Sequence, residues 1–197
     1  MTFKLGLTGS IGMGKSTTAA MFAKAGCRVW DADAAVHRLY AQKGTAVEPL
    51  RLLFPTAIIH NEVSRTHLKN IIANDPDALR KIEAIVHPLV AADRASFLAE
   101  NAGHICVFDI PLLFETGGDA HMDAVACVTV PADIQMTRVL ERGTMTKAQF
   151  QQILSKQMPN DEKCARADYV IVTDTLDHVQ RQVQTILAEI KGKLIHA

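Results

Sequence analysis

The chain has 197 residues, enough for one well-buried domain with an inserted or attached subdomain. Its 21 lysine and arginine residues balance 21 aspartate and glutamate residues, which argues against a broad basic surface for nucleic acid. No apolar stretch approaches the roughly 20 residues of a membrane-spanning helix, and glycines interrupt the N-terminal segment before a secretory signal could form. The four cysteines are far apart and include no C-x-x-C pair, so we expect buried, reduced thiols in a cytoplasmic protein.

The N-terminal part of the sequence, residues 3–31, predicts a strand, a loop, a helix and a second strand. Residues 3–8 form an apolar, β-like run, a glycine loop covers 9–14, and helical spacing extends over 15–25. Gly26 is placed to end that helix, and residues 27–31 predict the second strand. This order is typical of the start of a parallel α/β sheet.

The segment 34–102 changes to helical periodicity, as in the spacing of Ile82 and Val86. Pro76 predicts the first turn of a helix, and Pro88 predicts a break followed by a new start. This segment therefore predicts a mostly helical subdomain inserted between two strands.

The sheet resumes after the insert. Strands are predicted over 104–110, 124–130 and 169–173, and helices over 132–142, 146–157 and 176–191. The result is an α/β, three-layer fold with a five-stranded parallel sheet, whose core is formed by residues 1–33 and 103–197. Ligands of such a sheet bind at the carboxyl ends of its strands.

Residues 9–16 match the phosphate-loop pattern G-x-x-x-x-G-K-[ST] at every position. Glycines allow consecutive backbone N–H groups to point inward, and the following helix adds its positive N-terminal end. Lys15 can reach the β- and γ-phosphates, and the Ser16 hydroxyl can bind Mg²⁺. We expect the nucleotide to contact Gly9, Ser10, Ile11, Gly12, Met13, Gly14, Lys15, Ser16 and Thr17.

A nucleotide loop leaves the class of protein open. No N-K-x-D motif for guanine is present, and a short chain with a helical insert fits phosphoryl transfer to a small acceptor better than a mechanical ATPase. A kinase for a nucleoside monophosphate, gluconate or shikimate is one alternative. A regulatory nucleotide-binding module without turnover is another.

Four runs together resemble the dephospho-coenzyme A kinase family: LGLTGSIGMGKSTTAAMFAKAGCRVWDAD, SRTHLKNIIANDPDALRKIEAIVHPLV, FDIPLLFE and ILSKQMPNDEKCARADYVIVTD. The resemblance implies a P-loop kinase core, a helical acceptor-binding insert and a small lid over about 139–150. It implies ATP and Mg²⁺ as cofactors, and transfer of the γ-phosphate to the ribose 3′-hydroxyl of dephospho-CoA in the last step of coenzyme A synthesis. It implies no nucleic acid, membrane or obligate protein partner.

The lid departs from the family pattern. Arg142 is followed by Gly143-Thr144-Met145, where the family often has Arg-Asp, so it stays open which arginine reaches the phosphates. Met13 stands where serine is common, and we expect its side chain to point away from the phosphates.

Three carboxylates are candidates for the site. By resemblance, Asp33 orients the acceptor hydroxyl and takes its proton; the alternative is a helix N-cap, a role that Asp31 can fill. Asp109 ends the third strand, where it is either a magnesium-side carboxylate or the cap of a turn. Glu115 is either a site residue or a solvated or capping carboxylate.

The basic candidates are Lys15, Arg138 and Arg142, which we expect to act on the transferred phosphate. The two arginines are four residues apart on one helix face and lead into the lid; the alternative is a solvated face. Arg65 suits the acceptor pyrophosphate, or is an exposed helix-surface residue. The family assigns His87 to the acceptor site, and the alternative is a capping or packing role.

Overall fold

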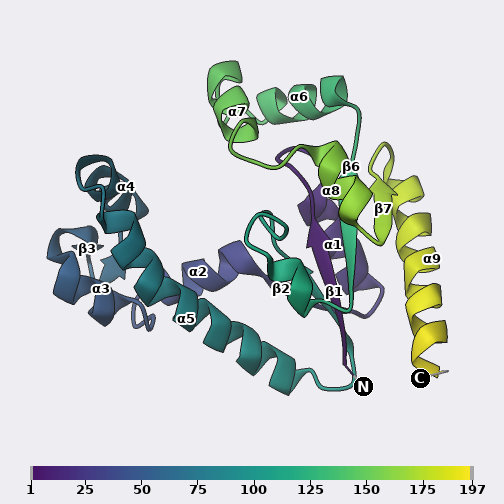
Figure 1. Ribbon diagram of the computed structural model, residues 1–197, viewed down its shortest axis with the longest axis horizontal. Helices are drawn as coiled ribbons and strands as arrows, with labels where there is room; N and C mark the ends of the chain where they lie inside the picture. The colour runs from purple at the N-terminus through teal and green to yellow at the C-terminus, as the bar shows by residue number, and fades with distance from the viewer. Residues whose placement is uncertain (1, 196–197) are drawn as a thin grey trace. The chain divides into compact units, whose positions relative to one another are not determined.

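The computed structural model describes residues 2–195 and separates into two compact units (Figure 1). The core unit comprises residues 2–30 and 101–195, and the helical unit comprises residues 31–100.

The core unit is built on a five-stranded parallel sheet. Its strands are β1 (Phe3–Thr8), β2 (Arg28–Asp31), β5 (Ile105–Asp109), β6 (Ala124–Thr129) and β7 (Tyr169–Val172). Their order is β2-β5-β1-β6-β7, and Leu5 of β1 lies in parallel register with Val107 on one side and Ala124 on the other. Because β1 is central, the loop that follows it opens in the middle of the carboxyl edge of the sheet.

Helices cover both faces of this sheet. They are α1 (Lys15–Lys24), α6 (Ala132–Glu141), α7 (Lys147–Leu154), α8 (Asn160–Arg166) and α9 (Leu176–Ile195), with a short 3-10 turn η2 (Gly118–His121). Leu5 and Leu7 of β1 pack on one face in a cluster with Phe22 of α1 and Val183 of α9. The intervening Gly6 points to the opposite face, toward Leu113. Successive strand residues are therefore buried on both faces, which explains the continuous apolar runs in the sequence.

The helical unit has its own apolar core. Its elements are α2 (Ala32–Tyr40), α3 (Val47–Leu53), η1 (Pro55–Ala57), β3 (Ile58–Ile59), β4 (Glu62–Val63), α4 (Arg65–Asn74) and α5 (Ala78–Glu100). Leu50, Leu68 and Ile82, from α3, α4 and α5, meet in one buried cluster. Arg38 of α2 donates two hydrogen bonds to Asp93 of α5, which ties these helices together.

The predicted break at Pro88 is wrong, because α5 continues from Ala78 to Glu100 with Pro88 inside it. Proline within a helix loses one backbone hydrogen bond and costs about 3 kcal/mol. Before the proline, Ile82 and Val86 are buried in the apolar core of the helical unit. After the proline, Asp93 pairs with Arg38 of α2. These contacts hold both halves of α5 in the helical unit, which offsets the cost of the proline. Pro76 also lies before the helix rather than in its first turn.

Other boundaries differ from prediction. The helix predicted over 146–157 ends at Leu154, and the separate helix α8 that follows was not predicted. The small hairpin of β3 and β4 was also missed. Of the free cysteines, Cys27, Cys106 and Cys127 are buried as predicted, whereas Cys164 is only partly buried.

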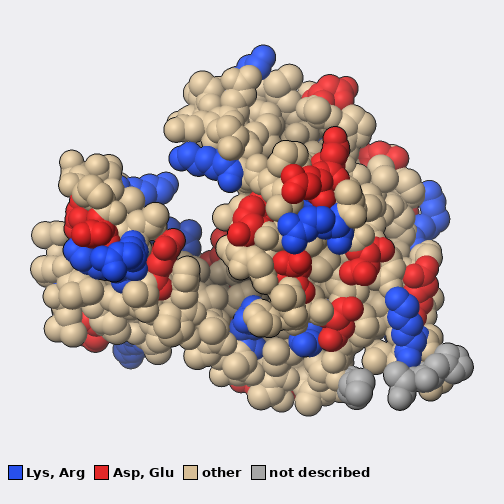
Figure 2. Space-filling view, viewed as in Figure 1, with Lys and Arg blue, Asp and Glu red and all other residues tan. Residues whose placement is uncertain are grey.

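The surface of the core unit carries both signs of charge. On the face drawn in Figure 2, acidic and basic side chains alternate, and neither sign forms a continuous patch over the core unit. No helix within residues 2–195 has the length and apolar character needed to cross a membrane.

Candidate active site

The P-loop connects β1 to α1 with backbone angles that glycine adopts readily. Gly12 has φ 81° and Gly14 has φ 90°, in the left-handed region. A Cβ atom on Gly12 would lie 2.5 Å from Cγ2 of Val139, and one on Gly14 would lie 3.0 Å from Oγ1 of Thr173. Both glycines are therefore required, by conformation and by the close approach of α6 and of the loop after β7.

The second half of the loop keeps its backbone donors available. Gly14 is the N-cap of α1, no side chain caps the helix, and no acidic residue lies in its first turn. Within the described part of the chain, no acceptor pairs with the backbone N–H groups of Gly12, Gly14, Lys15, Ser16 and Thr17. Unpaired N–H groups at the positive end of a helix form a binding site for an anion such as phosphate.

Lys15 forms an ion pair with Asp109. Lys15 Nζ donates to Asp109 Oδ1, and the Asp109 side chain is only 3% exposed. Asp109 is the last residue of β5 and lies in register with Leu7 of β1, which explains why its carboxylate meets the loop.

The residues near Lys15 fit a magnesium ion. Magnesium is usually bound by one or two protein oxygens together with waters and substrate phosphates, rather than by a full protein cage. Asp109 supplies a carboxylate, and Ser16 beside Lys15 supplies a hydroxyl. The described residues contain no cluster of three or more His, Cys, Asp or Glu side chains able to hold a metal.

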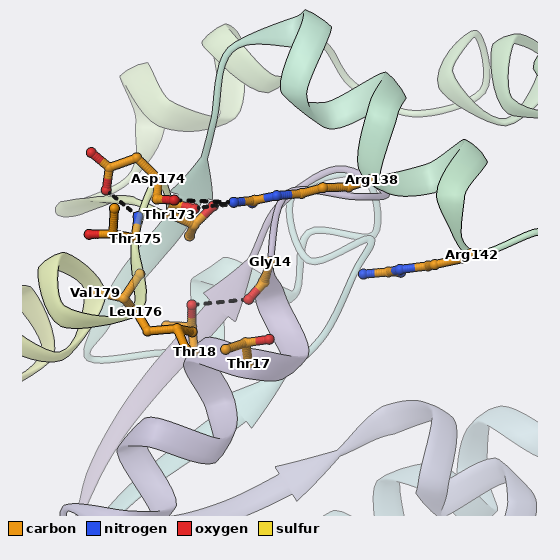
Figure 3. A pocket seen from close by; sticks show the side chains of 10 residues that line it. All are labelled: Gly14, Thr17, Thr18, Arg138, Arg142, Thr173, Asp174, Thr175, Leu176 and Val179. Atoms are coloured by element: carbon orange, nitrogen blue, oxygen red, sulfur yellow. Dashed lines mark hydrogen bonds between the residues drawn. The ribbon is translucent and has the colours of Figure 1, made fainter.

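A cavity of about 270 Å³ opens beside the start of α1 (Figure 3). It lies between α1, α6 and the loop that follows β7. Its lining consists of Gly14, Thr17, Thr18, Arg138, Arg142, Thr173, Asp174, Thr175, Leu176 and Val179. The cavity has apolar side chains and backbone on one side and two arginines on the other. This arrangement suits a nucleoside with its phosphates.

The two arginines of α6 have different environments. Arg138 donates to the carbonyl oxygen of Thr173 at 2.7 Å and to its Oγ1 at 3.2 Å. The Thr173 hydroxyl in turn donates to the carbonyl of Met13 at 2.8 Å, which links Arg138 to the P-loop. Arg142, one turn further on, is exposed, points toward the same cavity in Figure 3, and has no partner among residues 2–195. Arg142 is therefore the cation of this pair that is available to a ligand.

Met13 packs beneath the loop. Its side chain is 5% exposed, and its Sδ atom accepts a hydrogen bond from the N–H of Val130 at 3.3 Å. The thioether thus points away from the free amides, as predicted from the sequence.

Among the remaining candidates, Glu115 lies in the core unit, where it pairs with Lys163, and the others belong to the helical unit. Asp31 caps α2 by accepting a hydrogen bond from the N–H of Ala34 at 2.9 Å, as predicted. Asp33 lies in the first turn of α2, where it is exposed and is not needed as a cap. Arg65 begins α4; burial raises the pKa of Tyr40 and the charge of Arg65 offsets part of that rise. His87 is exposed on α5.

Three polar residues that hold the loop were not singled out from the sequence. Gln157 Oε1 accepts from the N–H of Ile11 at 3.2 Å, and Asn160 Oδ1 accepts from the N–H of Ser10 at 3.0 Å. Gln135 of α6 donates to the carbonyl of Ile11 at 2.6 Å. Gln157 and Asn160 lie in the Q-M-P-N run, whose only sequence signal was the family resemblance.

The core unit has a parallel sheet with a P-loop after its central strand, an uncapped helix start and an arginine-lined cavity. Together these features define a P-loop kinase. A sequence model of the dephospho-CoA kinase family matches residues 3–178. The dephospho-CoA kinase of Ruegeria pomeroyi is 66% identical over 197 residues, covering 100% of both chains. The chain therefore belongs to the dephospho-CoA kinase family, whose members are ATP-dependent kinases.

Solved structures agree with this fold. TT1252 from Thermus thermophilus superposes with a TM-score of 0.83 at 32% identity, covering 95% of this chain and 97% of that one. Dephospho-CoA kinase from Campylobacter jejuni gives a TM-score of 0.71 at 23% identity, covering 98% and 100%. The predicted α/β P-loop kinase fold and the family are thus confirmed.

Proposed function

We propose that this protein transfers the γ-phosphate of ATP to the ribose 3′-hydroxyl of dephospho-CoA, with Mg²⁺ and in the cytoplasm. The observation that carries the proposal is the set of unpaired N–H groups of Gly12, Gly14, Lys15, Ser16 and Thr17, next to the Lys15 ammonium group. A polyphosphate is the ligand that such a concentration of donors and positive charge recognises. The cytoplasmic location is supported by four free cysteines, which are typical of a reducing compartment.

In this proposal ATP binds with its phosphates on the P-loop and its nucleoside in the adjacent cavity. The backbone N–H groups donate to phosphate oxygens, and Lys15 donates to the β- and γ-phosphates. Arg138 supports the cavity wall through Thr173, whereas Arg142 is free to approach the transferred phosphoryl group. Ser16 and Asp109 would hold the magnesium ion, which offsets phosphate charge when bound.

The acceptor is assigned to the helical unit, residues 31–100, which overlaps most of the subdomain predicted over 34–102. Asp33 accepts a hydrogen bond and then the proton of the 3′-hydroxyl, which makes that oxygen a better nucleophile. Its exposure and its freedom from the capping role support this assignment. Arg65 suits the acceptor pyrophosphate, because a guanidinium can bind two phosphate oxygens at once, and His87 lies on the long helix of the same unit.

Residues 139–150, the end of α6 and the start of α7, are proposed as the lid. Their turn contains Gly143 with φ 64°, and Thr146 begins α7 with a capping box to Gln149. A lid that brings Arg142 over the phosphates would also exclude water, which would otherwise compete with the acceptor hydroxyl.

The test is ADP release with Mg-ATP in a coupled assay. Dephospho-CoA should support fast turnover, whereas AMP, gluconate, shikimate and no acceptor should not. Turnover with another acceptor would leave the nucleotide site intact and refute the proposed substrate. Nucleotide binding without ADP formation from any acceptor would indicate a regulatory module instead.

A further inference from the structure

The two halves of the P-loop are held in different ways. The amides of Gly12 and of Gly14 to Thr17 are free for a ligand, whereas those of Ser10 and Ile11 are already occupied by Asn160 and Gln157. Asn160 also donates to the carbonyl of Val128 at 3.3 Å, so its side chain joins the loop to β6. The loop is thus held at its first half by side chains of segment 157–163, and these bonds leave the second half open.

Segment 157–163 is itself anchored by a buried ion pair. Lys163 is 0% exposed, and its Nζ lies 2.8 Å from Glu115 Oε1 and donates to the carbonyl of Pro111 at 3.0 Å. Glu115 Oε1 also accepts from the N–H of Met158 at 3.0 Å. The Pro111 carbonyl accepts a second bond from the hydroxyl of Thr8, the last residue before the loop. Lys163 is too deeply buried to touch a nucleotide, so its contacts fix the segment.

We propose that Gln157 and Asn160 are positioning residues that preorganise the triphosphate site, with Lys163 and Glu115 holding their segment in place. The inference rests on the proposed binding of ATP and adds residues to it. Glycine-rich backbone is flexible, and inward-pointing amides must otherwise be ordered when the phosphates bind. Fixing the peptide groups of Ser10 and Ile11 beforehand removes part of that entropic cost, and so strengthens phosphate binding.

The inference predicts a loss that is selective for phosphates. We would replace Gln157 with methionine, which keeps the side-chain length and removes the acceptor, and measure displacement of a fluorescent N-methylanthraniloyl-ATP. Dissociation constants for ATP and for inorganic tripolyphosphate should rise about three- to tenfold, the range of one net hydrogen bond. The constant for adenosine, which has no phosphate, should stay within about twofold. The melting temperature of the variant should stay close to that of the wild type.

Gln152→Met is the matched control, because Gln152 is exposed on α7 and its side chain has no partner in the described part of the chain. Asn160→Leu is the second variant and should show the same selectivity for phosphate ligands. Unchanged ATP and tripolyphosphate constants in Gln157→Met, or an equal loss for adenosine, would overturn the inference. Tripolyphosphate needs no acceptor, so the wild-type assay with dephospho-CoA tests the proposed function separately.

Discussion

Replacing Lys163 with methionine tests the buried ion pair most directly. The substitution keeps an unbranched, apolar side chain in the site and removes only the ammonium group. Glu115, whose side chain is 19% exposed, is then left as a partly buried carboxylate without its cation. It retains only its hydrogen bonds to backbone N–H groups, those of Met158 and of Glu115 itself, to offset its burial.

Breaking a buried ion pair by removing one partner costs about 3–5 kcal/mol. For a chain of this size, about 2–4 °C of melting temperature corresponds to each kcal/mol, so we expect a fall of roughly 6–20 °C. Lys4→Met is the matched control, because Lys4 pairs with Asp123 at the surface, where the two side chains are 35% and 38% exposed. A surface pair contributes about 1 kcal/mol or less, so this variant should melt within a few degrees of the wild type.

The deficit of Lys163→Met should depend on pH. Burial tends to raise the pKa of Glu115, but its bonds to Lys163 and to backbone N–H groups outweigh that effect and hold the pKa below 4.5. This stabilisation is present above the unfolded pKa and is lost as the pH falls through the folded value. Without Lys163, two of the causes that lower the pKa of Glu115 are lost, so its pKa rises above the wild-type value. Acid then protonates Glu115 at a higher pH and relieves the variant. The deficit should therefore be largest near pH 7 and shrink toward pH 4.

Thermal unfolding followed by circular dichroism from pH 4 to pH 8 measures both effects. Adding Glu115→Gln to Lys163→Met should restore part of the lost stability, because the amide oxygen can still accept from Met158 and no charge remains buried. A fall no larger than that of Lys4→Met, or a deficit independent of pH, would refute the role assigned to the pair.

Three further predictions concern chemistry. Asp33→Asn should fold with an unchanged melting temperature and lose about 10²- to 10⁴-fold in kcat, the range for a proton-accepting group; near-normal turnover would remove Asp33 from the mechanism. Arg142→Ala should lower kcat by about 10²- to 10³-fold. Arg138→Ala should mainly raise KM for ATP, because the contact of Arg138 with Thr173 is lost. Full turnover in both variants would refute the lid assignment. In thiol titration at pH 8, Cys164 should react first, because burial raises the pKa of Cys27 to about 11 and shields it; fast reaction of Cys27 would contradict its burial.

The sequence by itself determined the P-loop and the class of fold. The loop is contiguous, so its glycines, Lys15 and Ser16 could be read as one motif, and the strands around it are apolar because the sheet is buried on both faces. Capping by Asp31 was predictable for the same reason, since the bond to Ala34 spans only three residues. The roles of Asp33, Arg65 and His87 remain predictions.

Only the tertiary structure decided how the loop is held. Helix α8 has seven residues, too few for a clear period, and local rules also failed at Pro88, where packing of α5 outweighs the preference to end the helix. Gln157 is 146 positions from Ile11, and Asn160 is 150 positions from Ser10. Which buried polar groups satisfy one another depends on how distant segments pack, and no local pattern encodes that pairing.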